Sequence, residues 1–181
     1  METIPKSTEF SCHMQEMMIS DFYAACPPPS YALYQLTLLH SIGIANFMLT
    51  YAVSHGYDTE FAEDLYLLGL LSRIGYLNNP DGIAYEKRSF SIAIRNNVFQ
   101  NKREFAEALS YQETFINNPS KPLQLLWLAR LCISLEGDYI GYMNNYNYIC
   151  EAYKSNEYDK NRFENNRQII EYLSINYPDY S

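Results

Sequence analysis

The chain is poor in the residues that build metal centres. It has only three histidines among 181 residues: His13, His40 and His55. Its four cysteines are widely spaced, with no Cys-x-x-Cys pair, so they do not form a zinc set with a nearby histidine. We expect them to be free thiols in a reducing cytosol; they are Cys12, Cys26, Cys132 and Cys150.

Basic residues are also few. Thirteen Lys and Arg stand against 21 Asp and Glu, for a formal net charge of −8, and no basic cluster is dense enough to follow a nucleic-acid backbone. No apolar run approaches the roughly 20 residues of a membrane span, and Met1 to Phe10 lacks the apolar core of a signal peptide. We therefore expect no nucleic-acid or membrane partner, and a cytoplasmic location.

Several enzyme signatures are missing. The sequence contains no phosphate-binding glycine loop, no Gly-x-Ser-x-Gly elbow and no His-Glu-x-x-His pair. These absences exclude the common P-loop, α/β-hydrolase and zincin sites.

What is present is helical periodicity. Apolar residues recur at three and four residues, no strand pattern appears, and Pro or Gly residues separate the periodic segments. We predict an all-α fold, a bundle of about seven or eight helices. The expected segments are a short helix with Met14, Met17, Met18 and Phe22 as its apolar stripe, a helix from Ser30 past Tyr51, one from Asp58 to Ser72 or Arg73, and further helices near 86–99, 102–115, 120–137, 139–153 and 162–176.

Proline divides the chain once. Pro27 to Pro29 should form a stiff spacer, which makes residues 1–29 an N-terminal arm. Residues 30–181 should then form a single domain, with the tyrosine-rich helices of 139–181 packed on it.

Two central helices carry a recognisable frame. It reads Leu-Leu-His-Ser-Ile-Gly-Ile-Ala from Leu38, then Tyr-Leu-Leu-Gly-Leu-Leu-Ser-Arg-Ile-Gly-Tyr-Leu from Tyr66, and later Leu-Leu-Trp-Leu-Ala-Arg from Leu125. This layout resembles the HD-domain metal-dependent phosphohydrolases, in which a His, a His-Asp pair and a later Asp hold a divalent metal. The resemblance covers about residues 31–137 and implies a helical HD-like scaffold.

The ligands of that family are mostly replaced. His40 matches the first ligand, but Ser72 stands where the second His belongs, Arg73 where its Asp neighbour belongs, and Arg130 where the last Asp belongs. Guanidiniums repel a cation and stay charged at any physiological pH. The resemblance therefore implies a vestigial site with no metal, no cofactor and no catalytic residue.

These residues have two readings. His40 could be a core histidine bonded to a backbone carbonyl or to Ser72, and the arginines could turn outward or pair with an acid such as Glu136 or Asp138. Alternatively, Arg73 and Arg130 could form a metal-free anion site for a phosphate or nucleotide, because two forked donors suit such a group.

Tyrosine is the most conspicuous residue type, with eighteen in the chain. One predicted helical face repeats it at three- and four-residue spacing: Tyr139, Tyr142, Tyr146 and Tyr153. This face could pack on the domain, or it could be an exposed partner surface, since tyrosine is enriched in interface hot spots.

Three functional hypotheses follow. The leading one is a catalytically inactive HD-like domain that binds a protein partner as a regulator or adaptor. The second is a divergent phosphohydrolase whose metal is held by His40 and acids such as Asp64 or Asp81. The third is a metal-free nucleotide or anion sensor that uses Arg73 and Arg130.

Overall fold

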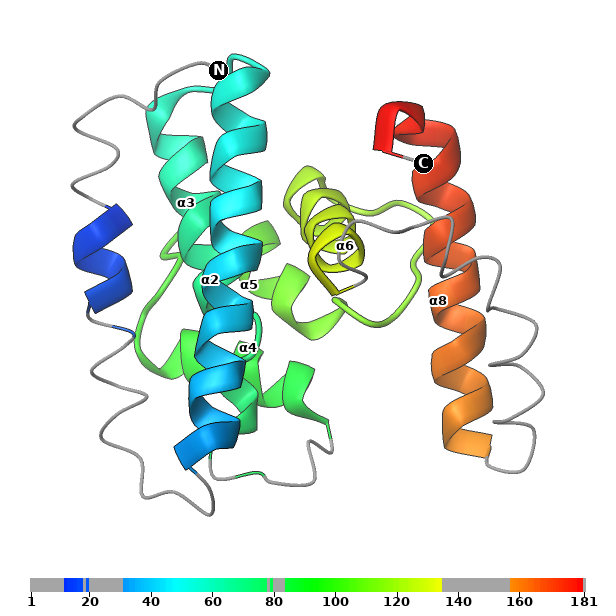
Figure 1. The fold of residues 1–181 in the computed structure, drawn as a ribbon, viewed down its shortest axis with the longest axis horizontal. Coiled ribbons are helices and arrows are strands. Elements are labelled where there is room, and N and C mark those ends of the chain that lie inside the picture. The colour runs from blue at the N-terminus through cyan, green and yellow to red at the C-terminus, as the bar shows by residue number, and fades with distance from the viewer. Residues whose placement is uncertain are drawn as a thin grey trace.

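The computed structural model describes residues 12–17, 19, 31–77, 79, 84–134 and 157–180. These residues form α-helices and short 3₁₀ turns, with no strand among them, so the predicted all-α bundle is confirmed (Figure 1). After a short helical segment at 12–17, the elements are α2 (Tyr31–Ser54), α3 (Thr59–Leu71), η1 (Ile74–Tyr76), α4 (Tyr85–Arg95), α5 (Arg103–Ser110), α6 (Lys121–Ser134), α8 (Glu157–Asn176) and η2 (Pro178–Tyr180).

The central pair is an antiparallel hairpin of α2 and α3. Asp58 caps α3 as predicted, since its carboxylate accepts a hydrogen bond of 2.8 Å from the Phe61 amide. At Gly69 the two backbones approach so closely that a Cβ there would lie 2.4 Å from the Cα of Ala45. A larger residue at Gly69 would therefore force the hairpin apart.

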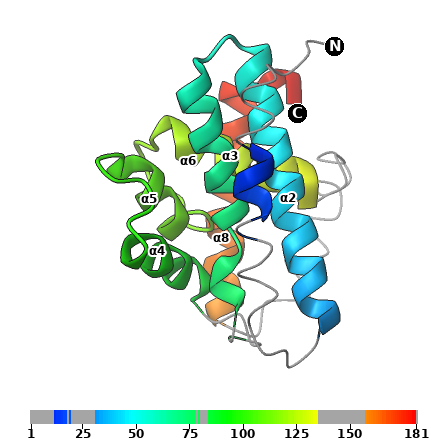
Figure 2. The same ribbon diagram turned by 90° about the vertical axis from the view of Figure 1, so that its left-hand side faces the viewer.

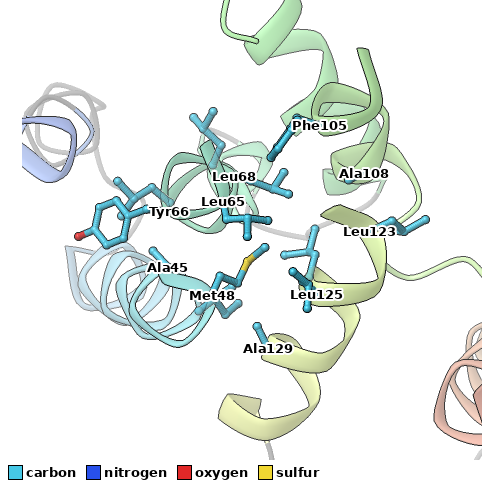
Figure 3. Packing of buried hydrophobic residues seen from close by; sticks show 14 of the residues in the cluster. Ala45, Met48, Leu65, Tyr66, Leu68, Phe105, Ala108, Leu123, Leu125 and Ala129 are labelled. Atoms are coloured by element: carbon cyan, nitrogen blue, oxygen red, sulfur yellow. The ribbon is translucent and has the colours of Figure 1, made fainter. Parts of the chain in front are cut away.

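The core lies between this hairpin, α5 and α6. Figure 3 shows Met48 of α2 and Leu65 of α3 facing Leu125 of α6, with Phe105 of α5 closing one side. All four side chains are buried, as is Trp127. Burial of each large apolar side chain contributes about 1.5–3 kcal/mol to folding, so this packing holds the elements that carry the predicted site.

The next layer is built on a second glycine contact. Gly75 of η1 lies against α4, where a Cβ would come 1.9 Å from the carbonyl oxygen of Tyr85. Its amide donates a 2.9 Å hydrogen bond to the buried Ser89 hydroxyl. The end of α3 is thereby held against α4 (Figure 2).

Helix α8 returns to the body beside α6 (Figure 1). It buries Ile169, Ile170 and Leu173, and Tyr172 packs edge-on to the Trp127 ring at 6.0 Å. The C-terminal residues then reach the end of α2, where the Tyr180 ring lies 5.8 Å from that of Tyr51.

Several predicted boundaries differ from the structure. The helix predicted at 86–99 ends earlier, at Arg95, because 96–102 is a loop with left-handed backbone at Asn97, Phe99 and Asn101. The helix predicted at 102–115 also ends earlier, at Ser110. Helix α8 begins at Glu157, five residues before the predicted start at 162.

The stripe assigned to the first helix was wrong in part. Met14 and Met17 are 45% and 49% exposed, whereas Cys12 is buried and Ile19 packs on the core. Glu16 instead ties this helix to α3, accepting a 2.9 Å hydrogen bond from the Tyr66 hydroxyl. Met14 and Met17 therefore do not form the buried face of this helix.

The predicted tyrosine-rich helix, 139–153, lies outside the described residues. Within the described ranges, no helix combines the length and the apolar character needed to cross a bilayer.

Candidate functional site

Three of the four vestigial-site residues come together electrostatically. His40 is on α2, Arg73 follows α3 and Arg130 is on α6. Partial burial, followed by the nearby guanidiniums of Arg73 and Arg130, lowers the pKa of His40 to about 4. His40 is therefore a neutral imidazole at physiological pH, in a positively charged neighbourhood.

Ser72 is the buried residue that ends α3. Its hydroxyl donates a 2.7 Å hydrogen bond to the Gly69 carbonyl, within its own helix. Its carbonyl oxygen accepts from Gln112 Nε2 at 2.7 Å and from the Ser89 hydroxyl at 3.3 Å. The Ser72 backbone thus connects α3 to α4 and to the segment after α5.

Arg130 is held by a buried carboxylate. Its Nη2 donates to Glu113 Oε1 at 2.6 Å, and its Nη1 donates to the carbonyl oxygen of Gln112. The same Glu113 oxygen accepts from the Tyr85 hydroxyl at 2.9 Å and from Arg162 Nη2 at 3.0 Å. We call Glu113, Tyr85, Arg130 and Arg162 the Glu113 cluster.

The cluster joins four parts of the fold. Tyr85 begins α4, Glu113 follows α5, Arg130 is on α6 and Arg162 is on α8. The Glu113 side chain is only 6% exposed and that of Arg130 is 14% exposed, so their pairing is largely shielded from water. Breaking such a pair is costly because it leaves a buried charge uncompensated.

The pKa values of two carboxyls in this region, Glu113 and Glu86, are shifted in opposite directions. Burial opposes the charge on Glu113, but Arg130, Arg162 and the Tyr85 hydroxyl outweigh it, so the pKa of Glu113 lies below its ordinary value. Burial, together with the neighbouring Glu113 carboxylate, raises the pKa of Glu86. The surroundings therefore favour the charged form of Glu113 and disfavour that of Glu86.

Arg73 is less completely bonded. Its guanidinium carbon lies 5.7 Å from the centre of the Tyr76 ring, which stacks on the Tyr85 ring at 4.2 Å. Its buried Nε has no hydrogen-bond partner among the described residues. Arg73, Arg130 and Arg162 together place three guanidiniums near the Tyr76 ring, and two of them, those of Arg130 and Arg162, bond to Glu113.

The residues present do not fit the divalent metal that the HD resemblance implies. Among the described residues, no three His, Cys, Asp or Glu side chains are grouped so that they could hold an ion. Asp64, considered as a ligand beside His40, is instead bonded to Lys102 at 2.5 Å. Asp81 lies outside the described residues.

Sequence reasoning missed the centre of the site. Arg130 was expected to pair with an acid, but the acids considered, Glu136 and Asp138, lie outside the described residues, and the partner found is Glu113. Glu113 has no local motif that marks it. The available signal was only its position after a short helix, beside Gln112. The tyrosine surface proposed at Tyr139, Tyr142, Tyr146 and Tyr153 also lies outside the described residues.

Comparison of the chain with family models, with curated proteins and with solved structures finds no match in any of the three.

The Glu113 cluster makes a testable contribution to stability. Arg130→Met should destabilise the fold by about 3 kcal/mol, because the Glu113 carboxylate loses the more buried of its two cationic partners. Arg130→Met combined with Glu113→Leu should cost less than the sum of the two single changes. Urea unfolding of all three variants measures this coupling.

The control is Arg167→Met, which removes an exposed arginine paired along α8 with Glu164 and Glu171. It should leave the unfolding midpoint nearly unchanged. Additive effects of the Arg130 and Glu113 changes would contradict a structural role for the pair.

His40 should make stability depend on pH. The pKa of His40 is about 4 in the folded protein and 6.5 in the unfolded chain. Because the unfolded chain binds the proton more readily, the free energy of unfolding falls as the pH decreases from 6.5 to about 4. His40→Gln should recover about 2 kcal/mol of this loss near pH 5. Unfolding near pH 7 and near pH 5 tests it, and an unchanged pH dependence in the variant would refute it.

Proposed function

We propose that this protein is a catalytically inactive HD-like domain that works in the cytosol by binding a protein partner, as a regulator or adaptor. The proposal combines the helical frame around His40 with the replacement of three ligand positions. Its acidic composition is compatible with a regulatory binding protein rather than a nucleic-acid or membrane binder.

One observation supports the proposal that the domain is catalytically inactive. The side chain at the position of the last HD aspartate, Arg130, is not open to a ligand ion but is bonded to Glu113 and to the Gln112 carbonyl. A fixed guanidinium near His40 disfavours a second cation by direct repulsion.

Two surfaces are candidates for binding the protein partner. The tyrosine face at Tyr139, Tyr142, Tyr146 and Tyr153 is the first candidate, on the strength of its spacing and its residue type. The exposed Met14 and Met17 of the first helix offer a second apolar surface.

Restoring the ligands tests the vestigial-site assignment. Ser72→His, Arg73→Asp and Arg130→Asp should be combined with Glu113→Gln, so that no buried carboxylate loses its counter-charge. If the frame is correctly aligned, this variant should gain Mn²⁺ binding, seen by calorimetry and as a higher melting temperature with metal.

The wild-type chain and a variant with Glu113→Gln alone are the controls, and neither should bind Mn²⁺ measurably. One metal per wild-type chain, or phosphodiester hydrolysis that His40→Ala abolishes, would overturn the pseudoenzyme proposal in favour of a divergent phosphohydrolase.

A second function, anion sensing, is favoured by one specific observation. Arg73 has a buried Nε–H with no partner among the described residues, next to the guanidinium-rich Glu113 cluster. A phosphate or nucleotide phosphate could accept that hydrogen bond and pair with the nearby guanidiniums. The Nε of Arg130 is also buried without a partner among the described residues, but both terminal nitrogens of Arg130 have acceptors, so Arg73 is the better candidate of the two.

Inorganic phosphate and a panel of nucleotides should then raise the melting temperature at low salt, with less effect as salt is added. Arg73→Gln should abolish the shift, whereas Arg167→Gln, which alters an exposed α8 arginine, should retain it. Stabilisation that survives Arg73→Gln would place the anion elsewhere.

A further inference from the structure

The positive charge of this acidic chain is concentrated in one segment. Residues 85–103 hold five basic residues and one acidic residue, for a formal charge of +4. The rest of the chain holds eight basic and twenty acidic residues, for −12. The segment comprises α4, the loop after it and the first residue of α5.

Much of this charge lies on one side of α4. At about 100° per residue, five positions fall within about a third of the helix circumference. They are Lys87, Arg88, Ser91, Ile94 and Arg95, which we call the α4 basic face. The opposite side contains Tyr85, Ser89 and Ala93, all buried against the body. The basic face is therefore the solvent side of α4.

The cations on this face are not neutralised by acids of the described residues. The two basic residues of the segment that lie outside the face are paired with acids: Lys102 with Glu60 and Asp64, and Arg103 with Glu107. Arg88 donates to the backbone carbonyls of Gly75 and Leu77, which anchor its side chain without cancelling its charge. Lys87 and Arg95 are exposed, and no ion pair joins either of them to a described residue.

An apolar side chain lies among these charges. Ile94 is 50% exposed and lies at one edge of the face, about 20° from Lys87 around the helix. A face that combines cations with an aliphatic side chain suits an acidic protein segment that also presents an apolar residue. It is less suited to a purely electrostatic ligand, for which Ile94 would contribute nothing.

The loop that follows α4 is held in one conformation by contacts with the body. Asn97, Phe99 and Asn101 all have positive φ, between 53° and 61°, a conformation that costs free energy for residues other than glycine. The Phe99 ring is anchored by stacking on Phe105 at 5.4 Å, and the Val98 amide bonds to the Ala93 carbonyl at 2.9 Å. Asn97, Gln100 and Asn101 of this loop are exposed.

We propose that the α4 basic face is a docking surface for a short acidic segment of a partner protein that carries at least one apolar residue. This deepens the proposed function, because it rests on a protein partner and names that partner's chemistry. A long polyanion or an anionic lipid surface is disfavoured, because the remaining −12 of the chain would repel it over distances comparable to the screening length.

The probe is a fluorescent synthetic peptide of glutamates interspersed with leucines, measured by anisotropy on the full chain at low salt. We expect binding that weakens with added salt and that falls by about tenfold or more in Lys87→Glu with Arg95→Glu. Ile94→Ser should weaken binding without changing its salt dependence. Arg103→Glu with Arg167→Glu is the matched control, since it changes the net charge equally at exposed sites outside the face and should retain binding.

Three outcomes would overturn the proposal. Peptide binding could be absent, or equal in the Lys87/Arg95 and Arg103/Arg167 variants. Phosphatidylserine vesicles or an oligothymidylate could bind the face more tightly than the peptide does. Sedimentation could show self-association that Lys87→Glu with Arg95→Glu abolishes, which would make a second copy the occupant. None of these results changes the metal-binding test, so failure of this surface is distinguishable from failure of the pseudoenzyme proposal.

Discussion

The buried carboxylate of Glu113 is the interaction on which the arrangement of the site depends. Arg130, Arg162 and Tyr85 all donate to one of its oxygens, from three different helices. An isolated carboxylate at this depth would be unfavourable, and isolated guanidiniums would repel each other. Each charge is therefore acceptable only when the others are present, which couples α4, α6 and α8. Arg130 of this cluster, together with Arg73, adds to the burial that lowers the pKa of His40.

The glycines of the HD-like frame have a packing explanation that is independent of chemistry. Gly69 is required where α3 meets the Ala45 backbone of α2, and Gly75 where η1 meets the Tyr85 carbonyl of α4. A helical hairpin with these close approaches would keep both glycines whether or not it ever held a metal. The glycines of the frame are thus explained by the way these helices pack.

Helix existence was predictable because it depends on local chemistry. The Asp58 cap, the proline near the start of α6 and the apolar centre of α3 each act over a few residues, and the structure contains the corresponding helices. Predictions failed where a nonlocal contact decided the outcome. Helix α4 ends at Arg95 because Phe99 turns inward to stack on Phe105, and the first helix exposes Met14 and Met17 because its buried contacts come from Cys12 and Ile19. Spacing alone does not distinguish these alternatives.

By itself the sequence determined the all-α class and the principal helices, because periodicity and capping are properties of the chain. Only the tertiary structure decided which acid pairs with Arg130. Glu113 precedes Arg130 by seventeen residues, and Arg162 lies further still from it, so no local pattern relates them. The physical reason is that the two partners of a buried ion pair are brought together by the packing of elements that are distant in the sequence, and their attraction is strong because the dielectric constant there is low. The side of α4 that faces solvent was decided in the same way, by the burial of Tyr85, Ser89 and Ala93 on the opposite side.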